Sequence, residues 1–194
     1  STNWENDMLY IDEYLIEARN SLSDLCVIKV GTKLIADGAF DGCESLTSVI
    51  IPYSVTTIGD SAFAFCDNLT SVSIPESITY IGNKAFYHCV NLTGITIPNS
   101  VTAIGDFAFD SCRALNSITL PKSVTDIGDA PFNCCNELRN IIVDADNPAY
   151  SSDSSGVLFD KNKTTLIQYP IGNDSYSYII PDTVKKKKKN AFFL

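Results

Sequence analysis

The sequence lacks any hydrophobic run long enough to cross a membrane, since no stretch of about 18 apolar residues occurs in its 194 residues. It is also short of positive charge, because 14 Lys and Arg residues stand against 23 Asp and Glu residues, for a net charge of −9. Five of those basic residues form one run, Lys185–Lys189. A surface this acidic repels phosphate backbones, so we expect no nucleic-acid partner and no transmembrane segment in this chain.

Residues with reactive side chains are also scarce. The seven cysteines include no Cys-x-x-Cys pair, so a zinc or redox motif has no support, and we expect no metal ion and no cofactor. There is a single histidine. Disorder is excluded too, because 45 % of the residues are hydrophobic and only 19 % are charged.

What the sequence does contain is a repeat with a period of 23 residues. An Ile-Pro pair, once Leu-Pro, begins at Ile51, Ile74, Ile97 and Leu120. Further columns keep this step: Ile-Gly pairs at Ile58, Ile81, Ile104 and Ile127; Phe40, Phe63, Phe86, Phe109 and Phe132; Cys43, Cys66, Cys89, Cys112 and Cys135; Leu46, Leu69, Leu92, Leu115 and Leu138. The step lies in the leucine-rich-repeat range of about 20–29 residues. A single unit of this size cannot stabilise itself, so the units must stack and share one core.

Each unit divides into three parts. Val72 and Ile74 alternate with serines over Leu69–Ile74, which predicts a strand with one solvent-exposed face. The strand is expected to end at Pro75, because proline has no N–H to donate. A second extended piece, Ile78–Ile81, lies on the opposite wall of the coil. A short helical turn over Lys84–Cys89 follows, with Asn83 as its N-cap. The equivalent caps are Asp60, Asp106 and Asp129, so this acidic column has a structural role rather than a metal-binding one.

The string Ile-Pro-x-Ser-Val-Thr-x-Ile-Gly-x-x-Ala-Phe-x-x-Cys-x-x-Leu resembles the BspA-type (treponemal-type) leucine-rich repeat. Four units match closely between Ile51 and Ile142, after a half-unit. The resemblance implies a leucine-rich repeat solenoid, a right-handed β/α superhelix that is mostly β with short helical turns and a parallel sheet on its concave wall. It also implies a surface or secreted, extracellular protein of a kind regarded as adhesins or host-interaction proteins.

We expect four regions along the chain. Residues 1–29 form an N-terminal capping hairpin segment and residues 30–142 carry the 23-residue repeats. Residues 143–179 form a variant repeat with a hairpin insertion, and residues 180–194 form a truncated, partly frayed final repeat.

Both ends of the repeat run carry hairpin patterns. Val157–Phe159 and Thr165–Tyr169 flank a polar turn, which predicts a hairpin. The N-terminal segment is a shorter copy, in which Met8–Ile11 matches Val157–Phe159 and Tyr14–Ile16 matches Thr165–Ile167. The alternative for Met8–Ala18 is an amphipathic capping helix.

In the final repeat, charged residues occupy positions that are expected to be buried. The Ile-Gly columns fall on Lys187 and Lys188, so we expect weak order from about Lys185 onward. The alternative is a basic patch for anionic glycans or lipids.

The repeat pattern offers few candidate catalytic or metal-binding residues. The column cysteines are expected to be buried free thiols that act as small hydrophobic residues, and Cys134 is the thiol expected to be most exposed. His88 and Cys89 belong to columns that face opposite ways, so they do not form a catalytic pair. Asp144, Asp146 and Asp153 lack the spacing of an EF-hand loop and are interpreted as a solvated turn.

The exposed face of the longer strands, called the strand wall below, offers little affinity for a ligand by itself. It has no Trp, Tyr or Arg, which dominate binding hot spots, and no Lys. Its outward residues are Ser48, Ile50, Ser71, Ser73, Gly94, Thr96, Ser117, Thr119, Asn140 and Ile142. Aromatic side chains instead gather at loop positions, where binding sites are more common. The ligand-binding candidates are Tyr53, Phe65, Tyr80, Tyr87 and His88.

Three functions remain open at this stage. The first is a non-enzymatic surface or secreted module that binds a protein or glycan ligand in adhesion or host interaction. The alternative is a structural spacer that holds another domain away from the cell, and a lower alternative is part of an uncharacterised enzyme. We expect a monomer, or weak association through the ends of the solenoid.

Overall fold

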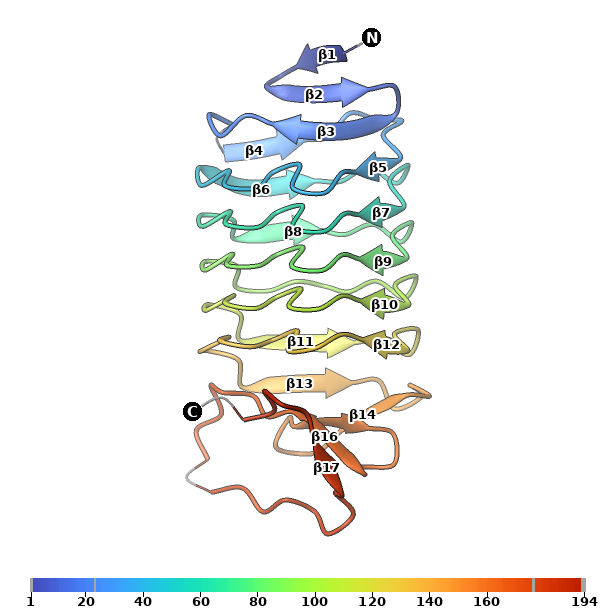
Figure 1. The fold of residues 1–194 in the computed structure, drawn as a ribbon, viewed down its shortest axis with the longest axis vertical. Coiled ribbons are helices and arrows are strands. Elements are labelled where there is room, and N and C mark those ends of the chain that lie inside the picture. Colours follow the sequence, from blue (N-terminus) through green and yellow to red (C-terminus); the bar gives the residue numbers. More distant parts are fainter. Residues whose placement is uncertain (1, 23, 176, 193–194) are drawn as a thin grey trace.

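The protein is a β-solenoid, in which the chain winds into coils stacked along the long axis (Figure 1). The structure, a computed structural model, describes residues 2–22, 24–175 and 177–192. In this part of the chain every regular element is a strand. Short strands lie on one wall of the stack and longer strands lie behind them on the other wall (Figure 1).

The described residues form four sheets. One has eight strands, in the order β1 (Thr2–Glu5), β2 (Met8–Ile11), β3 (Tyr14–Ala18), β5 (Leu34–Ile35), β7 (Thr57–Ile58), β9 (Tyr80–Ile81), β10 (Ala103–Ile104) and β12 (Asp126–Ile127). The opposite wall has β4 (Asp24–Val27), β6 (Leu46–Ile50) and β8 (Ser71–Ser73) in one sheet, and β11 (Ser117–Leu120) and β13 (Asn140–Val143) in another. The C-terminal sheet has β14 (Tyr150–Ser152), β15 (Leu158–Asp160), β16 (Thr165–Gln168) and β17 (Lys186–Lys187).

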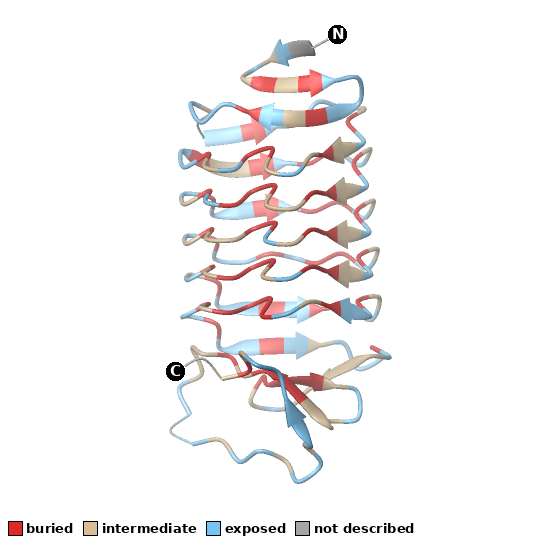
Figure 2. Cartoon of the chain, viewed as in Figure 1, coloured by how far each residue is buried: buried red, intermediate tan, exposed pale blue. Residues whose placement is uncertain are grey.

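The register of the coils follows the repeat. Ile58 pairs with Ile81 and Ile104 pairs with Ile127, always in parallel strands. Equivalent side chains are therefore superposed by a simple translation from coil to coil. The phenylalanine column shows this most clearly, because its rings stack nearly parallel, with centroids 4.8 to 5.8 Å apart. All five rings are buried. Buried residues recur at equivalent places in successive coils (Figure 2).

The short helical turns expected after each Gly column are wrong, because the structure has no helix in the described residues. Two residues in each of these turns adopt a left-handed backbone, as Ser61 and Phe65 do with φ of 54° and 55°. Such residues interrupt a right-handed helix. The turn bonds to the next coil instead: the N–H of Phe63 donates to Ala85 O at 2.8 Å, and that of Phe65 donates to Tyr87 O at 2.8 Å.

The acidic column has a structural role, but not that of helix caps. Each side chain accepts a hydrogen bond from the backbone N–H of the equivalent residue one coil later. Asp60 Oδ1 accepts from Asn83 N at 2.7 Å, Asn83 Oδ1 from Asp106 N at 2.8 Å, and Asp106 Oδ1 from Asp129 N at 2.7 Å. The column is a ladder between coils, and an Asp or Asn suits it because its short side chain carries an acceptor oxygen.

The strand wall follows the predicted alternation, with Val72 buried between exposed Ser71 and Ser73. The wall is interrupted at one coil, because the residues around Gly94 form no strand between β8 and β11. Glycine has no side chain to pack and a high entropic cost in a strand, which accounts for this gap. At the other end β4 adds exposed Leu25 and Val27 to the wall, next to Ile50.

An antiparallel hairpin covers the N-terminal end of the stack. β2 and β3 pair through Ile11 and Tyr14, and β1 adds a further antiparallel strand. The alternative of a capping helix over Met8–Ala18 is wrong. β3 then pairs in parallel with β5, which joins the hairpin to the first coil.

The C-terminal module repeats this arrangement. β15 and β16 form an antiparallel pair, and β16 pairs in parallel with β17, so that Leu166 lies beside Lys187. The five lysines of Lys185–Lys189 are exposed, while Ala191 is buried against a small second core. The fraying that the sequence predicts from Lys185 onward stays a prediction, and residues 193–194 lie outside the described part of the chain.

Two glycines give opposite expectations for stability. A Cβ at Gly94 meets no atom within 4 Å, whereas a Cβ at Gly105 comes within 2.6 Å of the backbone nitrogen of Asn83 in the preceding coil. We expect Gly94→Ser to raise the free energy of unfolding by about 0.5–1 kcal/mol, because serine leaves the unfolded chain with less conformational entropy to lose than glycine does. Gly105→Ser is expected to lower it by about 1–3 kcal/mol through overpacking.

Urea unfolding followed by circular dichroism measures both effects. The two variants introduce the same side chain, so each is the matched control of the other. Equal destabilisation by both would contradict the close approach of the coils at Gly105.

Candidate functional site

The outer turns of neighbouring coils bring three of the predicted aromatic residues together. Phe65 and His88 occupy the same left-handed position in successive coils, with φ of 55° and 60°. Their ring centroids lie 5.3 Å apart, and the Tyr87 ring lies 5.3 Å from Phe65 in an edge-to-face arrangement. Such pairs stabilise by about 0.5–1.5 kcal/mol beyond the burial of their area. The contacts among the three rings therefore hold the cluster in place.

Beside these rings lies a hollow of about 470 Å³, called the aromatic hollow below. Phe65, Tyr87 and Phe107 supply its rings, Asp41, Lys84 and Asp110 supply charges, and Ser61 and Ala64 form the remaining lining. The hollow exists because side chains of unequal size follow one another along the repeat. Ala64 and Ser61 are small, while Tyr87 and Lys84 stand in the same columns one coil later.

Asp110 is the most buried charge of the hollow, with a relative exposure of 7 %. Its Oδ1 accepts a hydrogen bond from the Ser111 hydroxyl at 2.8 Å, and its Oδ2 accepts one from Asn133 Nδ2 at 3.2 Å. No ion pair is formed by this carboxylate within the described residues. The Asn133 side chain, itself buried, leaves its Oδ1 without a partner.

The other predicted residues lie elsewhere or at the border of the hollow. His88 does not line it, and its Nδ1 lies 3.1 Å from Asp67 Oδ1. Tyr53 is 78 % exposed and makes no ring contact among the described residues. Tyr80 lies on β9, where partial burial and, to a smaller extent, nearby carboxylates such as Asp60 raise the pKa of its hydroxyl.

Sequence reasoning missed Phe107, Asp110, Lys84 and Asp41. The 23-residue period could have identified these four residues. Phe107 and Lys84 share a column, and so do Asp110, Tyr87 and Asp41. Residues of one column in adjacent coils are spatial neighbours, so the aromatic candidates should have been extended by 23 residues in both directions.

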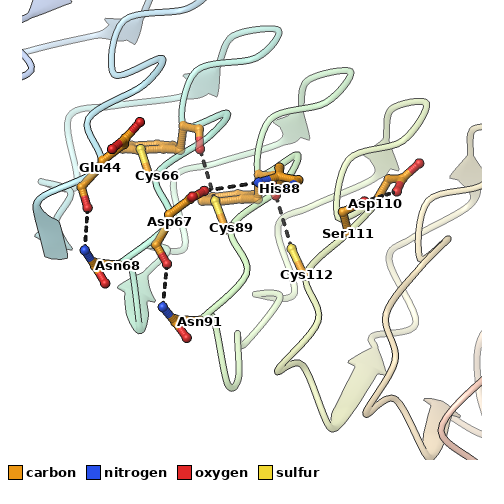
Figure 3. A network of polar contacts seen from close by, with 12 residues as sticks. Glu44, Cys66, Asp67, Asn68, His88, Cys89, Asn91, Asp110, Ser111 and Cys112 are labelled. Atoms are coloured by element: carbon orange, nitrogen blue, oxygen red, sulfur yellow. Dashed lines mark hydrogen bonds and ion pairs between the residues drawn. The ribbon is translucent and has the colours of Figure 1, made fainter.

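His88 and Cys89 diverge, as their columns predict (Figure 3). The Cys89 thiol is buried and donates to Phe63 O at 3.0 Å. Cys66, Cys112 and Cys135 make the same bond to the phenylalanine carbonyl of the preceding coil, each at 3.1 Å. All seven cysteines are free thiols, and six of them, including the whole column, are buried.

Burial raises the pKa of the buried thiols, to about 11 for Cys43 and about 12 for Cys26, and well above its usual value for Cys112. Cys134 is the only cysteine that is not fully buried. A thiol held in its protonated form is a poor nucleophile, so these cysteines contribute packing and a hydrogen bond rather than reactivity.

The aspartates of the polar segment after β13 hold turns. Asp144 Oδ1 accepts from the N–H of Asp146 at 2.8 Å, and Asp153 Oδ1 accepts from the N–H groups of Ser155 and Val157, each at 3.0 Å. Over residues 2–22, 24–175 and 177–192 no group of three or more His, Cys, Asp or Glu side chains is placed to hold a metal ion. In the same residues no helix has the length and apolarity that a membrane span requires.

Comparison with protein families decides the relationship. The model of the BspA type leucine rich repeat region matches residues 33–154, in six copies. This chain belongs to the BspA-type leucine-rich repeat family. Among curated proteins none matches it.

Solved structures of bacterial leucine-rich repeat proteins share the fold. The pneumococcal vaccine antigen PcpA aligns with 99 % of this chain and 62 % of its own, at 24 % identity and a TM-score of 0.78. A leucine-rich repeat protein of T. pallidum aligns with 66 % of this chain and 62 % of its own, at 34 % identity and a TM-score of 0.63.

A third similar structure is described as a leucine rich cell surface protein of Faecalibacterium prausnitzii. It is 24 % identical, with a TM-score of 0.62 over 95 % of this chain and 65 % of its own. This chain therefore spans less than two thirds of each of these three structures.

The buried thiols predict a loss of stability at alkaline pH. Because their pKa values are raised in the folded state, the unfolded chain releases protons that the folded chain keeps. The contribution is fully present below the ordinary thiol pKa of about 8.5 and is lost as pH rises toward the folded values. We expect the free energy of unfolding to fall by about 1.4 kcal/mol per pH unit for each buried thiol above that pH.

Urea unfolding between pH 7 and pH 9, where the tyrosine hydroxyls are still largely protonated, measures this slope. Cys112→Ala is expected to lower stability at pH 7 and to reduce the alkaline slope by the share of one thiol. An unchanged slope in this variant would show that the column thiols are not the groups that titrate.

Proposed function

We propose that this chain is a non-enzymatic binding module of a surface or secreted bacterial protein. Its membership of the BspA-type family supports this proposal, as does its similarity to a protein described as a cell surface protein. A role in adhesion or host interaction, with a protein or glycan as ligand, follows from the same resemblance and is part of the proposal.

The observation that carries the proposal is the aromatic hollow. Tyrosine and other aromatic side chains are enriched in binding hot spots, and they contribute most where a pocket excludes water around them. Phe65 is 44 % exposed and Tyr87 is half-buried at the rim of a hollow of about 470 Å³, so part of each side chain is open to a ligand. Tyr53 and Tyr80 stay separate candidates outside this hollow.

Catalysis has no comparable support. A nucleophile needs a base within hydrogen-bond reach, whereas His88 contacts Asp67 and Cys89 bonds to a backbone carbonyl. The buried thiols are also kept protonated. We therefore propose a binding role rather than an enzymatic one.

A structural spacer is the second candidate. The strand wall favours it, because its outward side chains, such as Ser71, Ser73 and Thr96, are small and uncharged. A wall of this kind gives length and rigidity without a strong ligand site.

A screen of the whole chain against host-protein and glycan arrays separates the two candidates. We expect capture at micromolar concentration that falls at least tenfold in Phe65→Ala/Tyr87→Ala, since hot-spot aromatics contribute about 2 kcal/mol or more. Tyr14→Ala, which removes an exposed aromatic side chain far from the hollow in the sequence, is the matched control and is expected to bind as the unmodified chain does.

No capture at micromolar concentration would favour the spacer. Capture that survives loss of both rings would reject the hollow as the binding site. Urea unfolding of each variant shows whether a lost signal reflects unfolding.

A further inference from the structure

The chemistry of the aromatic hollow points to one kind of ligand group. We propose that the hollow binds the guanidinium group of an arginine that a basic segment of a partner protein presents. This inference rests on the binding function proposed above and names the chemistry of its ligand. Both of its parts, rings and carboxylates, are groups that bind a planar cation.

The rings form the first part. Phe65, Tyr87 and Phe107 line one hollow from three successive coils. The faces of aromatic rings attract cations within about 6 Å, and arginine is favoured because its planar group also stacks. The chain itself shows this attraction, because Lys84 Nζ lies 5.8 Å from the centroid of Tyr87.

The carboxylates form the second part. Asp110 lines the hollow, is 7 % exposed and has no cationic partner among the described residues. An ionised carboxylate accepts about four hydrogen bonds, and the donors from Ser111 and Asn133 account for two of them. Burial of an unpaired charge is costly, so a cation that reaches Asp110 gains more than it would at an exposed site.

Charge complementarity favours a basic protein segment over a neutral sugar. The chain carries a net charge of −9, and the exposed Asp41 adds a second carboxylate to the hollow. Such a surface speeds the encounter with a basic partner and orients it. A neutral sugar would stack on the rings but would leave the charge of Asp110 unpaired.

The chain holds an internal example of a cation on this side of the coils. Lys188, from the C-terminal module, donates to Asp129 Oδ1 at 2.7 Å, across 59 residues. Its neighbourhood includes Phe107, whose ring also lines the aromatic hollow. A basic segment therefore already contacts the acidic column one coil away from the proposed site.

A substitution of Lys84 distinguishes a guanidinium ligand from other ligands most clearly. Its ammonium group lies over Tyr87 and competes with an incoming cation for the same ring. Removal of this charge should strengthen the binding of a guanidinium group and should weaken or leave unchanged the binding of a ligand that uses Lys84 as a hydrogen-bond donor.

The test uses the whole chain and two capped peptides, Ser-Gly-Arg-Gly-Ser and its citrulline counterpart, which has the same shape without the charge. Chemical-shift titration by NMR is expected to map the arginine peptide to the amides of Ala64, Tyr87 and Asp110, with at least tenfold weaker binding of the citrulline peptide. Lys84→Met is expected to tighten the arginine peptide at least twofold, and Asp110→Asn to weaken it at least tenfold.

Asp182→Asn, which removes an exposed carboxylate far from the hollow in the sequence, is the matched control. Tyr87→Leu provides a second variant if Asp110→Asn does not fold. Equal binding of the two peptides, no shift at the hollow up to 10 mM arginine peptide, or shifts at the hollow with a neutral oligosaccharide alone would each overturn the guanidinium assignment. Array capture that depends on Phe65 and Tyr87 would then leave the proposed binding function intact.

Discussion

Hydrogen bonds between successive coils are the constraint on which the rest of this structure depends. On both strand walls and along the outer turns, backbone N–H groups of one coil pair with carbonyl groups of a neighbouring coil. This pairing fixes the coils at strand spacing and leaves only translation between them. Identical side chains must then lie over one another, which is why the phenylalanine rings stack in parallel rather than meet edge to face.

The same constraint decides which residues each column tolerates. Gly82 and Gly105 lie where a Cβ would come within 2.8 Å of the preceding coil, so the Ile-Gly column keeps glycine for close approach rather than to break a strand. Cysteine fits its column because it is small, apolar and able to donate to the carbonyl below it. Such columns fill the interior of the coils, and the site proposed above lies on the outer turns.

The sequence predicted the coils, the register and the hairpins because each of these follows from periodicity. Phe63 and Phe86, 23 residues apart, had to occupy equivalent positions. The conformation of the outer turn did not follow in this way. An Asp or Asn such as Asn83 is as favourable at a helix N-cap as in a ladder between coils, and only the left-handed backbone of Lys84 and His88 separates the two. The local preference of Asp and Asn is compatible with both conformations. The hydrogen bonds to the neighbouring coil determine which of the two the turn adopts.

The aromatic hollow could not be predicted residue by residue, because it is a property of columns. In a perfectly regular solenoid each column would hold one residue type, and the surface would be a set of even ridges. Here one column changes from Asp41 to Ala64 to Tyr87 to Asp110 in four successive coils. The small side chain of Ala64 leaves a space, Tyr87 forms one side of it, and the buried carboxylate of Asp110 adds a charge. Departures from the repeat therefore create the aromatic hollow, while the constant step of 23 residues holds its parts in register.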